Sequence, residues 1–251
     1  MAGGFLEVPP CNVDTVMTSD GTGTEQLAPL IGISRLRMGS DGRGITTLVA
    51  FYGCPLRCRH CLNPQCLPDN APAMQKTSDE VAAILRKDEL YFRATGGGVT
   101  FGGGEPLLHD SFIREVLEKT DGGWHTTVET SLNVPRPRIG ALLPFIDEWI
   151  VDVKDMNPQT YRGYTSRDNA MVLENLRWLV SKGRSGGIVC RVPLIPGFND
   201  EAARQDSVAF LKSLGLSRFD LFTYRVGPNE FETAEHRKVA YEIRTFNTAT
   251  L

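Results

Sequence analysis

Three cysteines lie close together in one short segment, where Cys54, Cys58 and Cys61 form a C-x3-C-x2-C run. They follow residues 46–52, an apolar and β-branched stretch that is typical of a strand. A [4Fe-4S] cluster has four irons and usually four cysteine ligands. A loop that supplies only three leaves one iron open to a ligand that takes part in chemistry, as in open catalytic metal sites. The spacing therefore predicts a reactive iron-sulfur cluster.

A structural zinc site with His60 as its fourth ligand is the alternative for these cysteines. Zinc knuckles, however, bring paired ligands from two separate segments, and His60 directly precedes Cys61, where joint chelation is awkward. The remaining cysteines, Cys11, Cys66 and Cys190, are scattered and too few for a second cluster with four cysteine ligands. Their roles stay unassigned, and an open cluster is the preferred interpretation.

A glycine-rich segment, Gly102-Gly103-Gly104-Glu105, begins about forty residues after the cysteines. Glycine lets backbone groups approach a ligand closely and adopts positive φ freely. Alone, such a run usually marks a tight strand-to-helix turn. Its spacing from the cysteine loop makes a shared site the stronger interpretation.

Charged residues mark the ends of later strand candidates. Asp152 and Lys154 lie on one side of a strand, because alternate side chains share a face, and Glu129-Thr130 ends the neighbouring strand. They predict either a polar pocket mouth or a buried ion pair between strands. Arg191 either binds a carboxylate bidentately or pairs with one of these acids.

From residue 44 onward, apolar β-branched runs alternate with amphipathic helical stretches, which predicts six βαβ-type units and a parallel sheet. The expected strands are 46–53, 98–101, 126–130, 148–153, 187–194 and 219–224, with a short additional strand, 31–38, against the first unit. The expected helices are 78–91, 107–119, 136–143, 169–181, 201–214 and 232–245. Thr77 with Glu80 reads as a capping box, and Asp200 as an N-cap.

Six units are too few to close an eight-stranded barrel, so the predicted fold is α/β, an open (β/α)6 partial TIM barrel. Loops at the carboxyl ends of parallel strands form the active site in such folds. Cys54, Gly102, Thr130 and Asp152 all fall at such ends. The elements therefore bring the candidate residues together.

Composition sets the broad class. With 251 residues and 41% hydrophobic content, the chain can bury a full core, and a net charge of −3 gives no reason to expect nucleic-acid or membrane binding. We expect neither a membrane span nor a secretory signal. Six cysteines then fit a reducing, cytoplasmic setting. Residues 1–30 contain no Lys or Arg and read as an N-terminal extension, either a partner-binding segment or a tail packed without chemistry.

The cysteine spacing together with the glycine segment resembles the radical S-adenosylmethionine (radical SAM) superfamily. Ser40-Asp41-Gly42-Arg43-Gly44-Ile45 narrows the resemblance to the glycyl-radical-enzyme activating enzymes, with the pyruvate formate-lyase activating type nearest. Further matching segments are 53–58, 96–105, 152–157 and 191–200. The resemblance covers about residues 31–226 and implies a radical SAM partial-barrel domain over 31–251.

This resemblance implies an enzyme whose cluster reduces S-adenosylmethionine to methionine and a 5′-deoxyadenosyl radical. The radical removes a hydrogen atom from a backbone glycine of a glycyl-radical enzyme or another peptide substrate. A reduced flavodoxin or ferredoxin would supply the electron, and the enzyme itself would be an oxygen-sensitive monomer that works anaerobically.

The resemblance also assigns residues by position. Cys54, Cys58 and Cys61 would ligate the cluster, and the adenine and methionine parts would be bordered by His60, Leu62 and Asn63. The amino group would be held by Gly103, Gly104 and Glu105, and the S-adenosylmethionine pocket would be formed by Glu129, Thr130, Asp152 and Lys154, with a monovalent cation as a further candidate. Arg191 would be a basic contact beside this pocket, and Asp41 would lie near the target peptide.

Three departures from the family pattern concern the pocket. Arg43 replaces a proline, which fixes φ as arginine does not. Ser131-Leu132 replaces Asn-Gly after Glu129-Thr130, where Glu129 itself replaces an aspartate, and Arg225 replaces a histidine. The first bears on the peptide loop, and the others on cation binding and the ribose contact.

Two other functions stay open. One is a radical SAM enzyme that modifies a ribosomal peptide or a small molecule. The other is an iron-sulfur electron carrier, whose cluster would normally have four protein ligands and no nucleoside pocket. The glycine-glutamate segment argues against the carrier, and tight S-adenosylmethionine binding would exclude it.

Overall fold

The computed structural model describes residues 26–224, apart from residues 40, 69, 73 and 121. Its centre is one eight-stranded sheet with the order β3-β1-β2-β4-β5-β6-β7-β8. Six of these strands run parallel: β2 (Ile45–Phe51), β4 (Gly98–Gly103), β5 (His125–Thr130), β6 (Glu148–Asp152), β7 (Ile188–Arg191) and β8 (Arg218–Asp220). The sheet does not close on itself, so the predicted open partial barrel is confirmed.

Two antiparallel strands extend the sheet beyond β2. β1 (Leu27–Met38) pairs with β2, as expected for the additional strand, although it begins at Leu27 instead of Ile31. β3 (Met74–Thr77) pairs with the start of β1 and was not predicted. Four residues that run directly into a helix are too few to show a strand period.

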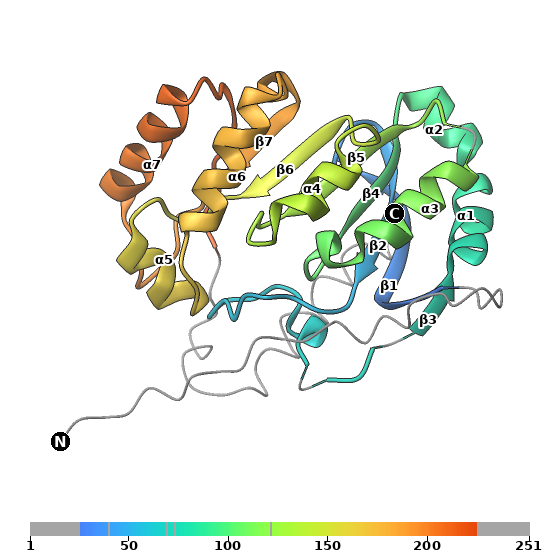
Figure 1. Ribbon diagram of the computed structural model, residues 1–251, viewed down its shortest axis with the longest axis horizontal. Helices are drawn as coiled ribbons and strands as arrows, with labels where there is room; N and C mark the ends of the chain where they lie inside the picture. The colour runs from blue at the N-terminus through green and yellow to red at the C-terminus, as the bar shows by residue number, and fades with distance from the viewer. Residues whose placement is uncertain (1–25, 40, 69, 73, 121, 225–251) are drawn as a thin grey trace.

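The described residues form seven α-helices. They are α1 (Ser78–Arg86), α2 (Glu89–Thr95), α3 (Asp110–Lys119), α4 (Arg136–Leu142), α5 (Pro158–Thr165), α6 (Ala170–Ser181) and α7 (Glu201–Ser213). Those other than α5, which lies at the carboxyl end of the strands, cover one side of the sheet (Figure 1). The capping box is present, because Thr77 Oγ1 accepts from Glu80 N and a Glu80 carboxylate oxygen accepts from Thr77 N. Asp200 caps α7 by accepting from Ala203 N at 2.9 Å. The expected helix 232–245 and most of the expected N-terminal extension lie outside the described residues.

The continuous helix predicted over 78–91 is wrong, because the chain turns at Asp88 between α1 and α2. The Asp88 carboxylate is buried and accepts from Arg35 Nε at 3.0 Å and from Thr47 Oγ1 at 2.7 Å. Burial alone would raise the pKa of Asp88, but these two hydrogen bonds lower it below its usual value. Contacts with distant strands therefore override the local helical pattern.

The two faces of the sheet differ in chemistry. Fully buried apolar side chains on the helix-covered face include Val49, Phe101, Val128, Val151 and Cys190. The residues that alternate with them face the other side and carry polar groups at the carboxyl ends of the strands. None of the helices in the described part is long and apolar enough to cross a membrane.

Candidate active site

The cysteine loop follows β2 at its carboxyl end. Cys54, Cys58 and Cys61 are half-buried, and none of them is in a disulfide. The loop is tied to the end of α5, because Arg57 N donates to Thr165 O at 2.9 Å and Arg59 N donates to Tyr164 O at 3.0 Å. Three thiols outside any disulfide are therefore held on one anchored loop.

The glycine segment packs directly against this loop. Glu105 N donates to Gly53 O at 2.8 Å, and Asn63 Nδ2 donates to Gly103 O at 2.9 Å. A Cβ on Gly104 would lie 2.2 Å from Gly53 O, and Gly103 has a φ of +95°. The close approach requires glycine at 104, and the positive φ favours glycine at 103. The two segments that sequence analysis singled out thus meet at the carboxyl ends of β2 and β4.

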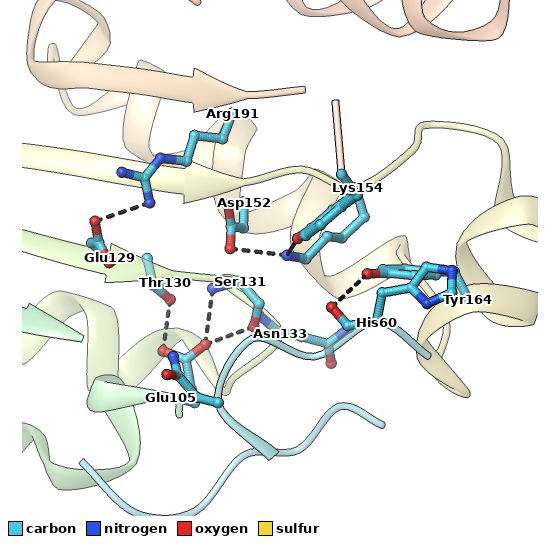
Figure 2. Close-up of polar contacts among 12 residues, drawn as sticks. His60, Glu105, Glu129, Thr130, Ser131, Asn133, Asp152, Lys154, Tyr164 and Arg191 are labelled. Carbon is cyan, nitrogen blue, oxygen red and sulfur yellow. Dashed lines mark hydrogen bonds and ion pairs between the residues drawn. The ribbon is translucent and has the colours of Figure 1, made fainter. Parts of the chain in front are cut away.

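Glu105 is fully buried, and its carboxylate faces Thr130 and Ser131 (Figure 2). Its Oε1 accepts from Thr130 Oγ1 at 2.7 Å, and its Oε2 accepts from Ser131 N at 2.9 Å and Ser131 Oγ at 2.6 Å. Burial raises the pKa of Glu105, and the hydrogen bonds from Ser131 and Thr130 oppose that rise. Sequence reasoning missed this role of Ser131, because nothing in the pattern pairs it with a residue 26 positions earlier.

Lys154 and Asp152 form an ion pair at the carboxyl end of β6 (Figure 2). Lys154 Nζ donates to Asp152 Oδ2 at 2.9 Å and to the Tyr224 hydroxyl at 3.3 Å. Burial alone would lower the pKa of Lys154, but the Asp152 charge together with the nearby Tyr224 and Cys58 groups outweighs it, and the pKa lies well above its usual value. Lys154 therefore stays charged. Sequence analysis gave Tyr224 no role in the site, because its contact with Lys154 depends on the three-dimensional course of the chain after β8.

Arg191 pairs with an acid, the second of the two expectations for it. Its Nη1 lies 2.9 Å from Glu129 Oε1, and its Nε donates to Asp220 Oδ2 at 3.3 Å. Burial raises the pKa of Glu129 to about 7; Arg191 lowers it, whereas Asp41 and Asp152 add to the rise. Glu129 is therefore an acid that titrates near neutral pH.

The Asp41 loop contacts the uncovered face of the sheet away from the cysteines. The Asp41 carboxylate accepts from Arg37 Nε, and the Asp41 carbonyl accepts from Thr100 Oγ1. Gly42 has a φ of +110°, and a Cβ there would lie 2.9 Å from Thr127 Oγ1. Beside this loop is a cavity of about 450 Å³, which Arg43 and Arg191 help to line.

Two aromatic rings pack against His60. The rings of Tyr164 and Phe198 lie 5.9 and 5.8 Å from the His60 ring, and 5.2 Å from each other. The Tyr164 hydroxyl donates to the His60 carbonyl at 3.5 Å (Figure 2). Sequence analysis missed both aromatic residues. Leu62, by contrast, is 46% exposed.

The donor set of the cysteine loop fits an iron-sulfur cluster. Burial raises the pKa of Cys54, and the Glu105 and Cys58 charges add to the rise. No three His, Cys, Asp or Glu side chains within the described ranges converge on one metal ion. A cubane cluster does not need such convergence, because each thiolate binds a different iron. The three thiols of one loop therefore suit a cluster better than a single ion.

Comparisons with known proteins agree with this geometry. The model of the radical SAM superfamily matches residues 48–206. The (2S)-3-sulfopropanediol dehydratase activating enzyme of Klebsiella oxytoca is 35% identical, with 70% of this chain and 74% of that protein covered. The pyruvate formate-lyase 2-activating enzyme of Escherichia coli (strain K12) is 30% identical, with 70% of both chains covered. In fold, the chain is similar to Streptococcus suis SuiB bound to S-adenosylmethionine, with a TM-score of 0.55, 15% identity, and 80% of this chain and 49% of that chain covered.

Proposed function

The chain belongs to the radical SAM superfamily and, within it, to the activating enzymes of glycyl-radical enzymes, and on this basis we propose that it generates a glycyl radical on a partner enzyme. One observation carries the proposal furthest. Three thiols on one loop, none of them in a disulfide, lie against the Gly103–Glu105 backbone, where an open iron and an amino-acid ligand would meet. Cys54, Cys58 and Cys61 would hold the [4Fe-4S] cluster. When bound, the cluster and S-adenosylmethionine supply an electron and a 5′-deoxyadenosyl radical, which removes a hydrogen atom from the target glycine.

The glycine segment is proposed to bind the amino group of S-adenosylmethionine. Backbone carbonyls of Gly103 and Gly104 would accept from it, and the Glu105 carboxylate would supply the balancing charge. Thr130 and Ser131 hold that carboxylate in place. This fixed acceptor geometry costs no reorganisation when the ligand arrives.

The remaining pocket residues are proposed to surround the rest of the nucleoside. His60, Leu62 and Asn63 would border the adenine and methionine parts. The paired residues, Asp152 with Lys154 and Glu129 with Arg191, would form the polar wall. Because both carboxylates already have cationic partners, a monovalent cation would compete with Lys154 and Arg191 for them.

The partner is proposed to be a separate glycyl-radical enzyme whose peptide lies near Asp41. The relatives named above act, by their names, on a sulfopropanediol dehydratase and a pyruvate formate-lyase. For this chain we propose a flavodoxin or ferredoxin as electron donor, a monomeric state, an anaerobic and cytoplasmic setting, and no nucleic-acid partner. Cys54, Cys58 and Cys61 form no disulfide, and this together with the oxygen-labile cluster chemistry supports the reducing setting.

An anaerobic assay tests this function. The enzyme is reconstituted with iron and sulfide, reduced with dithionite and mixed with S-adenosylmethionine, with and without a candidate glycyl-radical enzyme. We expect 5′-deoxyadenosine together with a stable glycyl doublet in the EPR spectrum of the partner. Cleavage without a partner radical for any candidate would favour an enzyme that modifies another peptide or a small molecule. No cleavage despite a loaded cluster would contradict both functions.

A further inference from the structure

Lys154 has an unusual backbone conformation for its position. Its φ is +64°, in the left-handed region that residues with a Cβ disfavour, and its side chain is almost fully buried. Such conformations persist only where the surrounding structure holds them, and they gather at functional sites. The neighbours of Lys154 therefore need to supply this restraint.

The next residue, Asp155, is the first of these neighbours. It is 1% exposed, and its Oδ1 accepts from Asn157 N at 2.8 Å while its Oδ2 accepts from Asn199 Nδ2 at 3.0 Å. Within the described part of the chain, Asp155 forms no ion pair. A carboxylate buried among neutral partners is costly unless these hydrogen bonds are kept. Burial of the Asp155 carboxylate therefore favours keeping its hydrogen bond with Asn199.

Asn199 holds a second loop in the same way. Its Oδ1 accepts from Ile195 N at 2.6 Å, and its Nδ2 also donates to Pro193 O at 3.1 Å. The side chain thus closes the loop after β7. The preceding residue, Phe198, packs against the ring of His60.

Asp155 and Asn199 lie in two segments that carried the family resemblance, yet neither residue received a role there. Their hydrogen bond joins the loop that bears Lys154 to the loop that bears Phe198. One loop supplies a buried cation beside Asp152, and the other supplies an aromatic ring beside His60. The relative position of these two groups depends on this contact.

We propose that Asp155 and Asn199 are positioning residues for S-adenosylmethionine, because their hydrogen bond fixes the distance between Lys154 and Phe198 across the nucleoside site. This inference rests on the proposed function. Neither residue touches the ligand in this arrangement; each acts through the loop that it holds. Affinity for S-adenosylmethionine should therefore depend on whether one of the two side chains donates where the other accepts, and not on the identity of either one alone.

Exchanging donor and acceptor tests the match. Asp155→Asn sets an amide donor against one of the two donors that the carboxylate accepts from, Asn199 Nδ2 or Asn157 N, and Asn199→Asp places two carboxylates face to face. The double variant, Asp155→Asn with Asn199→Asp, restores one donor opposite one acceptor and leaves only the Pro193 carbonyl without its bond. The matched control is Thr47→Val, which removes a hydrogen bond of 2.7 Å to buried Asp88 near the amino end of β2.

The measurement is isothermal titration of S-adenosylmethionine into anaerobically reconstituted enzyme, with iron content and circular dichroism recorded for each variant. We expect each single variant to raise Kd by about tenfold, since a hydrogen bond to a buried charge is lost. The double variant should recover most of the affinity, and Thr47→Val should bind like the wild type. Because Asp155→Asn is nearly isosteric, it and the double variant decide the matter even if Asn199→Asp does not fold.

Three results would overturn the inference: wild-type affinity in a folded and cluster-loaded single variant, no recovery in the double variant, or an equal loss in Thr47→Val. If the wild type itself holds a cluster but binds no S-adenosylmethionine, the proposed function fails, and this positioning role fails with it. The ratio of variant to wild-type affinity thus separates the two failures.

Discussion

Ser131 donates both its backbone N–H and its hydroxyl to the same oxygen of Glu105, at 2.9 and 2.6 Å. A buried carboxylate is thereby held by a residue that departs from the family pattern. Sequence analysis connected Ser131 with cation binding, whereas Ser131 contacts Glu105, the residue proposed to bind the amino group. The serine at this departure from the family pattern therefore holds the Glu105 carboxylate.

Replacing this serine should weaken both stability and ligand binding. Ser131→Ala removes the hydroxyl donor while Glu105 stays buried, so we expect the free energy of unfolding to fall by about 1–3 kcal/mol. Urea denaturation measures this loss, and titration of S-adenosylmethionine measures the accompanying rise in Kd. Ser213→Ala is the control, since its exposed hydroxyl bonds only to Phe210 O within its own helix. Equal effects of the two substitutions would contradict the role.

Glu129 should make stability depend on pH. Its pKa in the folded protein is about 7, against an ordinary value of 4.5, so between these values the folded state keeps a proton that the unfolded state loses. The contribution of Glu129 to stability is therefore fully present below about pH 4.5 and is lost as pH rises towards 7, with a slope of up to about 1.4 kcal/mol per pH unit. Denaturation of the wild type and of Glu129→Gln across this window measures the difference. A pH-independent difference would show that Glu129 has an ordinary pKa.

The three loop cysteines should be the ones that retain iron. We expect Cys54→Ala, Cys58→Ala and Cys61→Ala each to lose most of the reconstituted iron and the visible absorption of the cluster. Cys190→Ala is the matched control, because that thiol is buried on the helix-covered face of β7. It should keep its iron and lose only stability. Full iron content in any of the three loop variants would remove that residue from the ligand set.

Gly104 should not tolerate even one added methyl group. The Cβ of Gly104→Ala would lie 2.2 Å from the Gly53 carbonyl, so the glycine segment and the cysteine loop would have to separate. We expect lower iron retention and a lower thermal midpoint. Gly163→Ala has no atom within 4 Å of its new Cβ and lies within α5, where alanine is the better helix former. That variant should be at least as stable as the wild type, and a similar loss in both would mean that the close approach is not what matters.

Much of the fold could be predicted from local patterns. The β-branched runs before Cys54 and at residues 98–101 and 126–130 are all strands, because apolar alternation records which side chains are buried. α5 was missed, although Asn157 followed by Pro158 is a helix-start signal that would have found it. The break at Asp88 had no local signal, because Arg35 and Thr47 lie 53 and 41 residues away in the chain.

The candidate site divides in the same way. The meeting of the cysteine loop with Gly103–Glu105 could be predicted, since parallel strands bring their carboxyl ends to one edge. The identities of the contacting partners could not. Tyr224 beside Lys154 and Phe198 beside His60 depend on the three-dimensional course of loops that have no repeating pattern.

The Asp41 loop lies beside Thr127, whereas Thr130, three residues further along the same strand, bonds to Glu105 under the cysteine loop. Three residues of strand span about 10 Å. Because side chains alternate along a strand, Thr127 and Thr130 also point to opposite faces of the sheet. Thr127 faces the Asp41 loop, whereas Thr130 points to the buried side where Glu105 lies. One strand therefore supports two separate surfaces, and a substitution at either threonine should disturb one of them and leave the other in place.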